Sequence, residues 1–273
     1  MVRSLWSAAT GMIAQQNNVD TIANNIANVN TTGYKTETNE FKSLLYQQLQ
    51  TRTTTANGEQ KPIGAQVGLG VRNASITSQF TQGSMLESEN IFAFALEGDG
   101  LFGVRGDDGQ TYYTRNGNFN VSIGNNGVLT LTTSDGMAVL NQDGNPITFP
   151  ADTISTKLSI DPDGRFFYPD ENNTPVLMDN LQIGTWQFQN RAGLKKEGDS
   201  LYSVTAASGA ALNENTNANL THSTIVQGYL EGSNVQIADE MVNLIVAQRA
   251  YEMNSKAITT TDEMLQQANQ LKR

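Results

Sequence analysis

The sequence predicts an α+β protein in which long N- and C-terminal helices pair as a coiled coil and an antiparallel β-rich domain is inserted between them. Two observations carry this prediction. Apolar residues recur at heptad spacing at the start of the chain and again at its end. Between these stretches, short apolar runs alternate with glycine-containing turn signals, which is typical of an antiparallel β domain.

The N-terminal helix is predicted from a seam of apolar side chains. The seam consists of Leu5, Met12, Val19 and Ile26 at heptad spacing, with Ile22 in the second seam position. The pattern predicts about 25 helical residues that end near Thr31-Thr32-Gly33, because glycine readily takes the left-handed cap conformation. The polar face is nearly uncharged: it carries Asn17, Asn18, Asn24, Asn25 and Asn28, and Arg3 and Asp20 are the only charges before Lys35.

A segment rich in Thr and Gln, from Tyr46 to Gly64, follows this helix. It has few large apolar residues and cannot bury enough surface to fold alone. The sequence therefore predicts an extended arm or a disordered loop, and composition does not choose between them.

The middle of the chain is predicted to be a β sandwich or an irregular barrel. Its turn signals include Gly98-Asp99-Gly100, Asp108-Gly109, Asn116-Gly117, Asn126-Gly127, Asp135-Gly136, Asp143-Gly144 and Asp163-Gly164. After Asn116-Gly117, apolar and polar residues alternate from Phe119 to Ile123, which predicts a tight hairpin at the Asn-Gly pair. A shift of the apolar pattern at Gly184 predicts a β-bulge.

The C-terminal helix is predicted from a second seam, formed by Ile237, Leu244, Tyr251, Ile258 and Leu265. Ser233-Asn234-Val235-Gln236 fits a capping box that starts this helix. The resulting division is an N-terminal helix over 1–34, an arm or connector over 35–70, a β-rich domain over 71–228 and a C-terminal helix over 229–273. The apolar seam of the N-terminal helix is expected to pack against that of the C-terminal helix.

Composition excludes several classes of function. The net charge of −10 and the pI near 4.6 argue against a nucleic-acid partner, because phosphate binding needs clustered Lys and Arg. The chain has no cysteine, so disulfides and thiolate metal sites are excluded. Arg3 precedes a short apolar run as in a secretory signal, yet Ser4 and Thr10 dilute the run and the seam continues past it, which argues against cleavage.

No catalytic, cofactor or metal site is predicted. His222 is the only histidine and has polar neighbours. The carboxylate pairs Asp107-Asp108 and Asp161-Pro162-Asp163 lie in turn signals, where Asp serves local backbone hydrogen bonding. The stretch beginning at Asp161 starts like a calcium loop but has Asn172 where a bidentate Glu is needed. Val67-Gly68-Leu69-Gly70-Val71 lacks the third glycine of a dinucleotide loop.

Four stretches of the chain resemble the bacterial flagellar rod and hook proteins. The N-terminal signature is SAATGMIAQQNNVDTIANNIANVNTTGYK and the C-terminal one is GYLEGSNVQIADEMVNLIVAQRAYEMNSKAITTTDEMLQ. ALEGDGLFGV and YTRNGNF resemble β-domain motifs of the same family. Within the family the resemblance is closest to members of the distal rod, because of the arm from Tyr46 to Gly64 and the run AQRAYEMNSKAITTTDEML.

The resemblance implies that the terminal helices pack subunit against subunit in the inner tube of a helical assembly. This would explain the uncharged face, because a buried amide finds hydrogen bonds at less cost than an unpaired charge. Beyond the two seams, the implied assembly residues are Asn24, Asn25, Asn28, Gly33 and Tyr34 in the N-terminal motif and Gly228, Ser233, Asn234, Gln248 and Arg249 in the C-terminal motif. Phe41 and Leu45 match a short export motif.

The function implied by the resemblance is that of a passive structural subunit of the distal rod, without reaction or cofactor. It would form a straight helical homo-polymer that carries motor torque to the hook, with other rod subunits and hook proteins as partners. The flagellar type III export apparatus would deliver it to the periplasm or cell wall without signal cleavage. One alternative is a proximal rod or hook protein of the same family. A second, of a different class, is a secreted β-domain enzyme or ligand-binding module, which would be a stable monomer with ordered termini.

Overall fold

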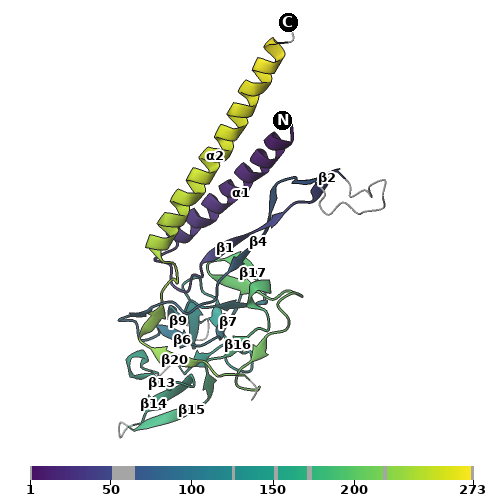
Figure 1. Cartoon of the computed structure of the whole chain (residues 1–273). Coiled ribbons are helices and arrows are strands. Elements are labelled where there is room, and N and C mark those ends of the chain that lie inside the picture. Colours follow the sequence, from purple (N-terminus) through teal and green to yellow (C-terminus); the bar gives the residue numbers. More distant parts are fainter. Residues whose placement is uncertain are drawn as a thin grey trace, which may run out of the picture. The chain divides into compact units, whose positions relative to one another are not determined.

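The computed structural model describes residues 2–50, 65–124, 127–150, 153–170, 174–217 and 220–271, and it confirms an α+β chain with a helix toward each end and antiparallel strands between them (Figure 1). The chain forms two compact units. The helical unit comprises Met1–Ala27, Glu37–Ser78 and Gln236–Arg273. The β unit comprises Asn28–Thr36 and Gln79–Val235.

Two long helices, α1 (Val2–Ala27) and α2 (Ile237–Gln270), lie side by side in the helical unit (Figure 1). Asn25 Nδ2 donates to Glu240 Oε2 at 3.1 Å. Further along, a Cβ atom on Gly11 would lie 2.9 Å from Nδ2 of Asn254. The two helices are therefore antiparallel, and glycine allows their close approach. Within the described residues, neither helix is long and apolar enough to cross a bilayer.

The ends of both helices differ from the prediction. α1 ends at Ala27, and Gly33 takes the predicted left-handed conformation (φ +71°) six residues later, beyond a turn. The predicted capping box is wrong, because α2 begins at Ile237 and its N-cap, Gln236, makes no side-chain cap hydrogen bond. Ser233 Oγ accepts instead from the backbone N–H of Val235. The side chain of Asn234 is held by other segments of the β unit, so a helix cannot start there.

Two antiparallel ladders complete the helical unit. β1 (Glu37–Ser43) pairs with β4 (Val71–Ser78), and β2 (Tyr46–Gln50) pairs with β3 (Ala65–Gly68). The predicted arm thus begins and ends as paired strands, while residues 51–64 lie outside the described part of the chain. Residues 71–78, expected in the middle domain, lie in the helical unit. Gly70 brings β4 against α1, where a Cβ atom would lie 2.1 Å from Oγ1 of Thr10.

The β unit is built on a ten-stranded antiparallel sheet with the order β12-β10-β11-β7-β8-β18-β17, to which β9, β16 and β19 add. These strands are β7 (Leu101–Arg105), β8 (Thr111–Thr114), β9 (Phe119–Ile123), β10 (Leu129–Thr133), β11 (Ala138–Val139), β12 (Thr148–Phe149), β16 (Thr185–Gln187), β17 (Lys195–Gly198), β18 (Leu201–Ser203) and β19 (Leu212–Asn213).

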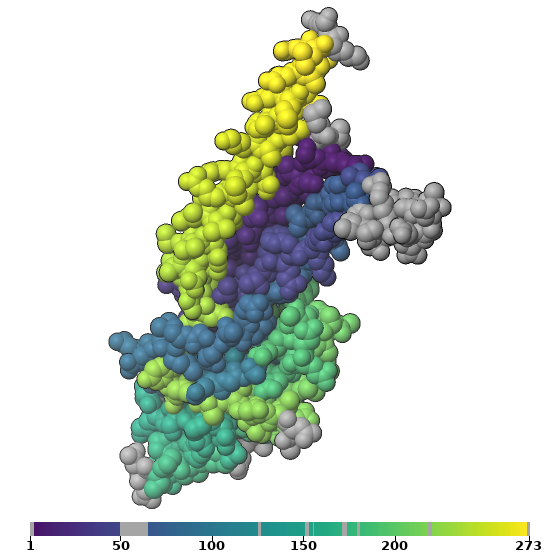
Figure 2. Space-filling view, viewed as in Figure 1, coloured from purple at the N-terminus to yellow at the C-terminus, as the bar shows by residue number. Residues whose placement is uncertain are grey.

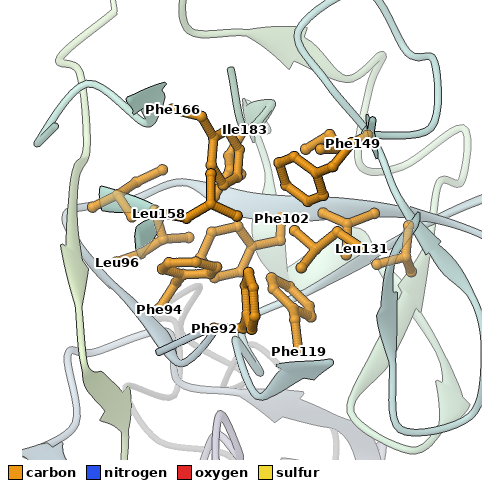
Figure 3. Close-up of a cluster of buried hydrophobic side chains, with 14 of the residues drawn as sticks. Phe92, Phe94, Leu96, Phe102, Phe119, Leu131, Phe149, Leu158, Phe166 and Ile183 are labelled. Atoms are coloured by element: carbon orange, nitrogen blue, oxygen red, sulfur yellow. The ribbon is translucent and has the colours of Figure 1, made fainter. Parts of the chain in front are cut away.

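Smaller antiparallel sheets and two short 3₁₀ helices surround this sheet. The small sheets are β13-β14-β15, β20-β6 and β21-β5. Their bounds are β5 (Met85–Glu87), β6 (Phe94–Glu97), β13 (Ser159–Ile160), β14 (Arg165–Pro169), β15 (Pro175–Gln182), β20 (Thr224–Gln227) and β21 (Tyr229–Glu231), and the 3₁₀ helices span Ser155–Lys157 and Arg191–Gly193. The main core gathers side chains from the large and the small sheets, with Phe102 among Phe94, Phe119 and Leu131 (Figure 3).

Two local predictions in the β unit are wrong. Asn116-Gly117 does not close a hairpin, because β8 pairs with β7 and β18 whereas β9 pairs with β10. Gly117 serves close packing, since a Cβ atom there would lie 1.8 Å from the carbonyl oxygen of Phe94. Gly184 is not a bulge either: β15 ends at Gln182 and β16 begins at Thr185 in a different sheet. In contrast, Gly136 and Gly144 take the positive φ expected of turn glycines.

Candidate functional site

The helical unit exposes an apolar surface on α2, which is the yellow helix in Figure 2. We call it the α2 apolar face, and it consists of Met241, Val242, Ile245, Val246 and Met253, each between 54% and 66% exposed. Residues of α2 that are buried or contact α1, such as Ala247 and Asn254, occupy another side of the helix. Trp6 and Ile13 of α1 are exposed as well. Large apolar surfaces of this kind mark interaction sites.

The predicted seams lie along α1 and α2, and the helix pair buries them only in part. Ile22 is buried, whereas Leu5, Met12, Val19 and Ile26 of α1 and Leu244, Ile258 and Leu265 of α2 are half-buried. Ile237 and Tyr251 are exposed. An open groove of about 360 Å³ brings together Gln16, Val19, Gln248, Tyr251 and Glu252. Two seam residues and one motif residue therefore share a surface that the chain itself leaves open.

Asn25, from the N-terminal motif, has a role that the sequence did not reveal. It is buried, and its side chain donates to the carbonyl of Glu37 (2.9 Å) and accepts from the backbone N–H of Glu37 (2.9 Å). Together with its bond to Glu240, these contacts join α1, β1 and α2. Asn24 is exposed and Tyr34 is half-buried, while Asn28 Oδ1 accepts from Thr31 Oγ1 at 3.1 Å.

Gly33 is held against other segments of the β unit by its backbone. Its N–H donates to the carbonyl of Glu231 at 2.8 Å, and a Cβ atom there would lie 2.6 Å from the backbone nitrogen of Asn116. This close contact leaves no room for a larger residue.

Replacing Gly33 with alanine is expected to lower the free energy of unfolding by about 1–3 kcal/mol, because the change adds a steric clash to an unfavourable φ. Gly136→Ala is the matched control, since Gly136 also has a positive φ but nothing lies within 4 Å of its Cβ position. It should cost only about 1 kcal/mol. Urea unfolding of both variants measures the difference, and equal losses would contradict the clash.

Asn234, in the C-terminal motif, binds two other segments of the β unit. Its Oδ1 accepts from the backbone N–H (2.7 Å) and the hydroxyl (2.8 Å) of Thr36, and its Nδ2 donates to the carbonyl of Gln79 (2.9 Å) and to Oγ1 of Thr81 (2.7 Å). The other motif residues have separate roles. Gly228 takes a positive φ (+77°), and the exposed Arg249 pairs with Glu252 at 2.8 Å.

A buried charged cluster of Lys35, Arg115 and Glu231 escaped the sequence analysis. Lys35 Nζ lies 2.5 Å from Glu231 Oε1, Arg115 Nε lies 3.6 Å from Glu231 Oε2, and all three side chains are at most 1% exposed. Burial lowers the pKa of Lys35, which the charge of Glu231 opposes, and burial likewise lowers the pKa of Arg115. The signal in the sequence was their position in three of the family motifs: Lys35 in the N-terminal signature, Arg115 in YTRNGNF and Glu231 in the C-terminal signature.

The groups considered for chemistry do not form a site. In the described part of the chain, no group of three or more His, Asp or Glu side chains could hold a metal ion. His222 is exposed. Asp108 accepts from the backbone N–H of Gln110 and the hydroxyl of Tyr112, which hold the pKa of its carboxyl below the usual value. Phe41 and Leu45 of the export motif are exposed, Phe41 on β1 and Leu45 just beyond it.

Comparison with known proteins gives three family matches spread along the chain. Residues 5–35 match the flagella basal body rod protein family, residues 95–168 match the flagellar hook protein FlgE/F/G D1 domain, and residues 226–271 match the flagellar basal body rod FlgEFG protein C-terminal family.

Full-length relatives agree with these matches. Flagellar basal-body rod protein FlgG of Borreliella burgdorferi is 43% identical, with 100% of both chains covered. The FlgG proteins of Agrobacterium fabrum (42%, covering 96% of this chain and 97% of the relative) and Bacillus subtilis (38%, covering 100% of both) are also similar. The chain is therefore a structural protein of the bacterial flagellum and not an enzyme. It belongs to the flagellar basal-body rod protein family and is a rod subunit.

Proposed function

We propose that this rod subunit builds the distal rod, where α1 and α2 pair as a coiled coil and pack against the helices of further copies in a straight helical homo-polymer. The polymer would carry motor torque to the hook. Neighbouring rod subunits and hook proteins would contact its two ends.

The observation that carries this proposal is the α2 apolar face. Burying a Val, Ile or Met side chain that was exposed contributes about 1.5–3 kcal/mol. Burial of five such side chains on one helix would strongly favour association with another subunit. A neighbouring subunit that covers them would also fill the open groove beside Val19 and Tyr251.

The spacing of the contacts between the helices supports a coiled coil. Gly11 meets Asn254, and Asn25 meets Glu240. From Gly11 to Asn25 is two heptads, and from Glu240 to Asn254 is two heptads, so the contacts stay in register along both helices. The half-buried seam residues between these points are then the side chains that more helices would cover.

The distribution of charge also supports assembly through the helices. The helical unit contains nine Lys or Arg residues and nine Asp or Glu residues. The β unit contains the other eight of the 17 basic residues and the other eighteen of the 27 acidic residues. The helical unit is thus neutral, and the β unit carries the whole charge of −10. Copies can therefore pack closely through the neutral helical unit. Close packing of β units, each with a charge of −10, would be opposed by electrostatic repulsion.

Deletion of the gene, followed by cryo-electron tomography of the basal bodies, tests the distal position. A truncated rod without a hook is the expected result. An intact rod lacking only the hook would favour a hook protein. That second candidate is supported by a match in the hook protein FlgE/F/G D1 domain and by a 33% identical relative, the flagellar hook-basal body complex protein FlhP of Bacillus subtilis. Complete flagella would contradict both.

We also propose that the chain reaches the periplasm or cell wall through the flagellar type III export apparatus without loss of an N-terminal signal, with Phe41 and Leu45 as a candidate export motif. Ala8 and Ala14 of α1 are buried, so cleavage of a signal-like segment would remove part of the helix pair. Mass spectrometry of the chain in isolated basal bodies tests this. A chain shortened by signal cleavage would contradict it.

In dilute solution we expect protease to cut α1 and α2 before the β unit, because both helices depend on neighbouring copies. A resistant fragment should remain within the predicted 71–228 domain, near residues 79–228. Limited proteolysis and hydrogen exchange measure this. Strong protection of both terminal helices in a dilute monomer would support a self-sufficient binding module instead.

A further inference from the structure

The chain crosses between its two units at four places, after Ala27, Thr36, Ser78 and Val235. Inside the β unit, the segments next to these crossings are residues 28–36, 79–84 and 229–235. All three segments meet at Glu231. The contacts described below lie wholly within the β unit.

Glu231 binds the other two segments through its carboxylate. Its Oε1 accepts from Lys35 Nζ (2.5 Å) and from the backbone N–H of Gly83 (2.9 Å). Lys35 Nζ also donates to the carbonyl of Thr81 at 2.7 Å. The Lys35 ammonium therefore joins the first segment to both of the others.

Backbone and amide bonds repeat these connections. The N–H of Gly33 donates to the carbonyl of Glu231, and the N–H of Gly232 donates to the carbonyl of Ser84, both at 2.8 Å. Asn234 adds its bonds to Thr36, Gln79 and Thr81. Each segment is thus bonded to each of the others.

Arg115 connects these three segments to the rest of the β unit. Its guanidinium lies beside Glu231 Oε2 and donates to the carbonyl of Gly98. Two cations and one carboxylate are therefore buried together. Buried ion pairs rarely add more stability than apolar residues of similar size, but removing one partner is costly and the geometry they impose is specific. The network is better explained by the fixed geometry of three segments than by stability alone.

We propose that Lys35, Arg115 and Glu231 form a force-sharing clasp, which holds together the three segments through which the β unit is connected to the helical unit. Force that reaches the β unit along one segment is then shared by all three. The load is that of the rod, so the inference rests on the proposed function. The three side chains are positioning residues, and they set the stiffness of the subunit.

Glu231→Gln and Lys35→Met test the clasp. Lys35→Met leaves Arg115 and Glu231 as a matched pair, so it remains informative if Glu231→Gln fails to fold. The control is Glu197→Gln, which breaks an exposed ion pair of the same unit (Lys195 Nζ to Glu197 Oε1, 2.8 Å). Hydrogen exchange of the purified full chain is the first measurement.

The amides of Gly33, Thr36 and Gly83 should exchange about tenfold faster in the clasp variants, while amides of the core strand β7 keep their protection. The same amides of the Glu197→Gln control should exchange at the rates of the unchanged chain. Equal acceleration throughout the β unit, or no acceleration at the three amides, would overturn the clasp.

The second measurement is the torsional compliance of rods in cells that carry each variant. Clasp variants should still form rods, with compliance above that of the control. Rods of unchanged compliance would overturn the force-sharing role and leave the rod assignment intact. Complete rods in cells that lack the chain altogether would count against the proposed function.

Discussion

Replacing Val246 with aspartate is expected to abolish rod assembly and motility. Val246 belongs to the α2 apolar face and is exposed in the single chain, so the change should alter the free energy of unfolding by no more than about 0.5 kcal/mol. In the proposed polymer the new carboxylate would be buried against apolar side chains, which costs several kcal/mol in every subunit. Swimming assays and tomography of basal bodies measure the outcome.

Asn243→Asp is the matched control, because it places the same carboxylate on an exposed position of the same helix. It should leave assembly largely intact. Cells that carry Val246→Asp and still swim normally on complete rods would contradict the proposed role of the α2 apolar face. Urea unfolding of the purified variant shows whether the loss reflects assembly or folding.

Replacing Phe102 with alanine is expected to destabilise the β unit by about 3–5 kcal/mol. Phe102 is fully buried, and its ring packs edge-on against Phe119 with 5.2 Å between ring centroids. The substitution removes this contact and leaves a cavity in the main core. Fluorescence-monitored urea unfolding measures the loss if Trp6 is changed to Phe, because Trp186 of the β unit is then the only tryptophan.

The control for Phe102 is Ile123→Ala, which shortens an exposed side chain on β9. It should change the free energy of unfolding by about 0.5 kcal/mol or less. A similar loss in both variants would show that the core does not depend on Phe102.

The two helices and many of the turns could be predicted because their signals are local. Heptad spacing defines α1 and α2 within a single stretch of sequence. A glycine after Asn or Asp marks a turn wherever the backbone needs a positive φ, as at Gly136 and Gly144. Local patterns fail where a glycine serves packing, so Asn116-Gly117 predicted a hairpin although Gly117 accommodates the carbonyl of Phe94.

The pairing of strands distant in sequence and the burial of charged side chains could not be predicted from local sequence patterns. β1 and β4 are mostly polar, so neither strand carries a strong alternation of apolar residues. They also pair with each other across the whole arm, which lies between them in sequence. Lys35, Arg115 and Glu231 were missed for another reason. Charged side chains are rarely buried completely, and only the partner, distant in sequence, makes such burial tolerable. The capping box failed because Asn234 is held by contacts with Thr36 and Gln79.

The helical unit draws on both ends of the chain, since α1 lies against a helix that begins more than two hundred residues later. A ribosome makes α1 before α2, so a nascent or truncated chain has α1 without its partner, and it lacks the tertiary packing that supplies most of the stability of helices in proteins. The helix pair exists only after α2 has been made. A chain that stops before α2 therefore also lacks the α2 apolar face, through which we propose that the subunit assembles.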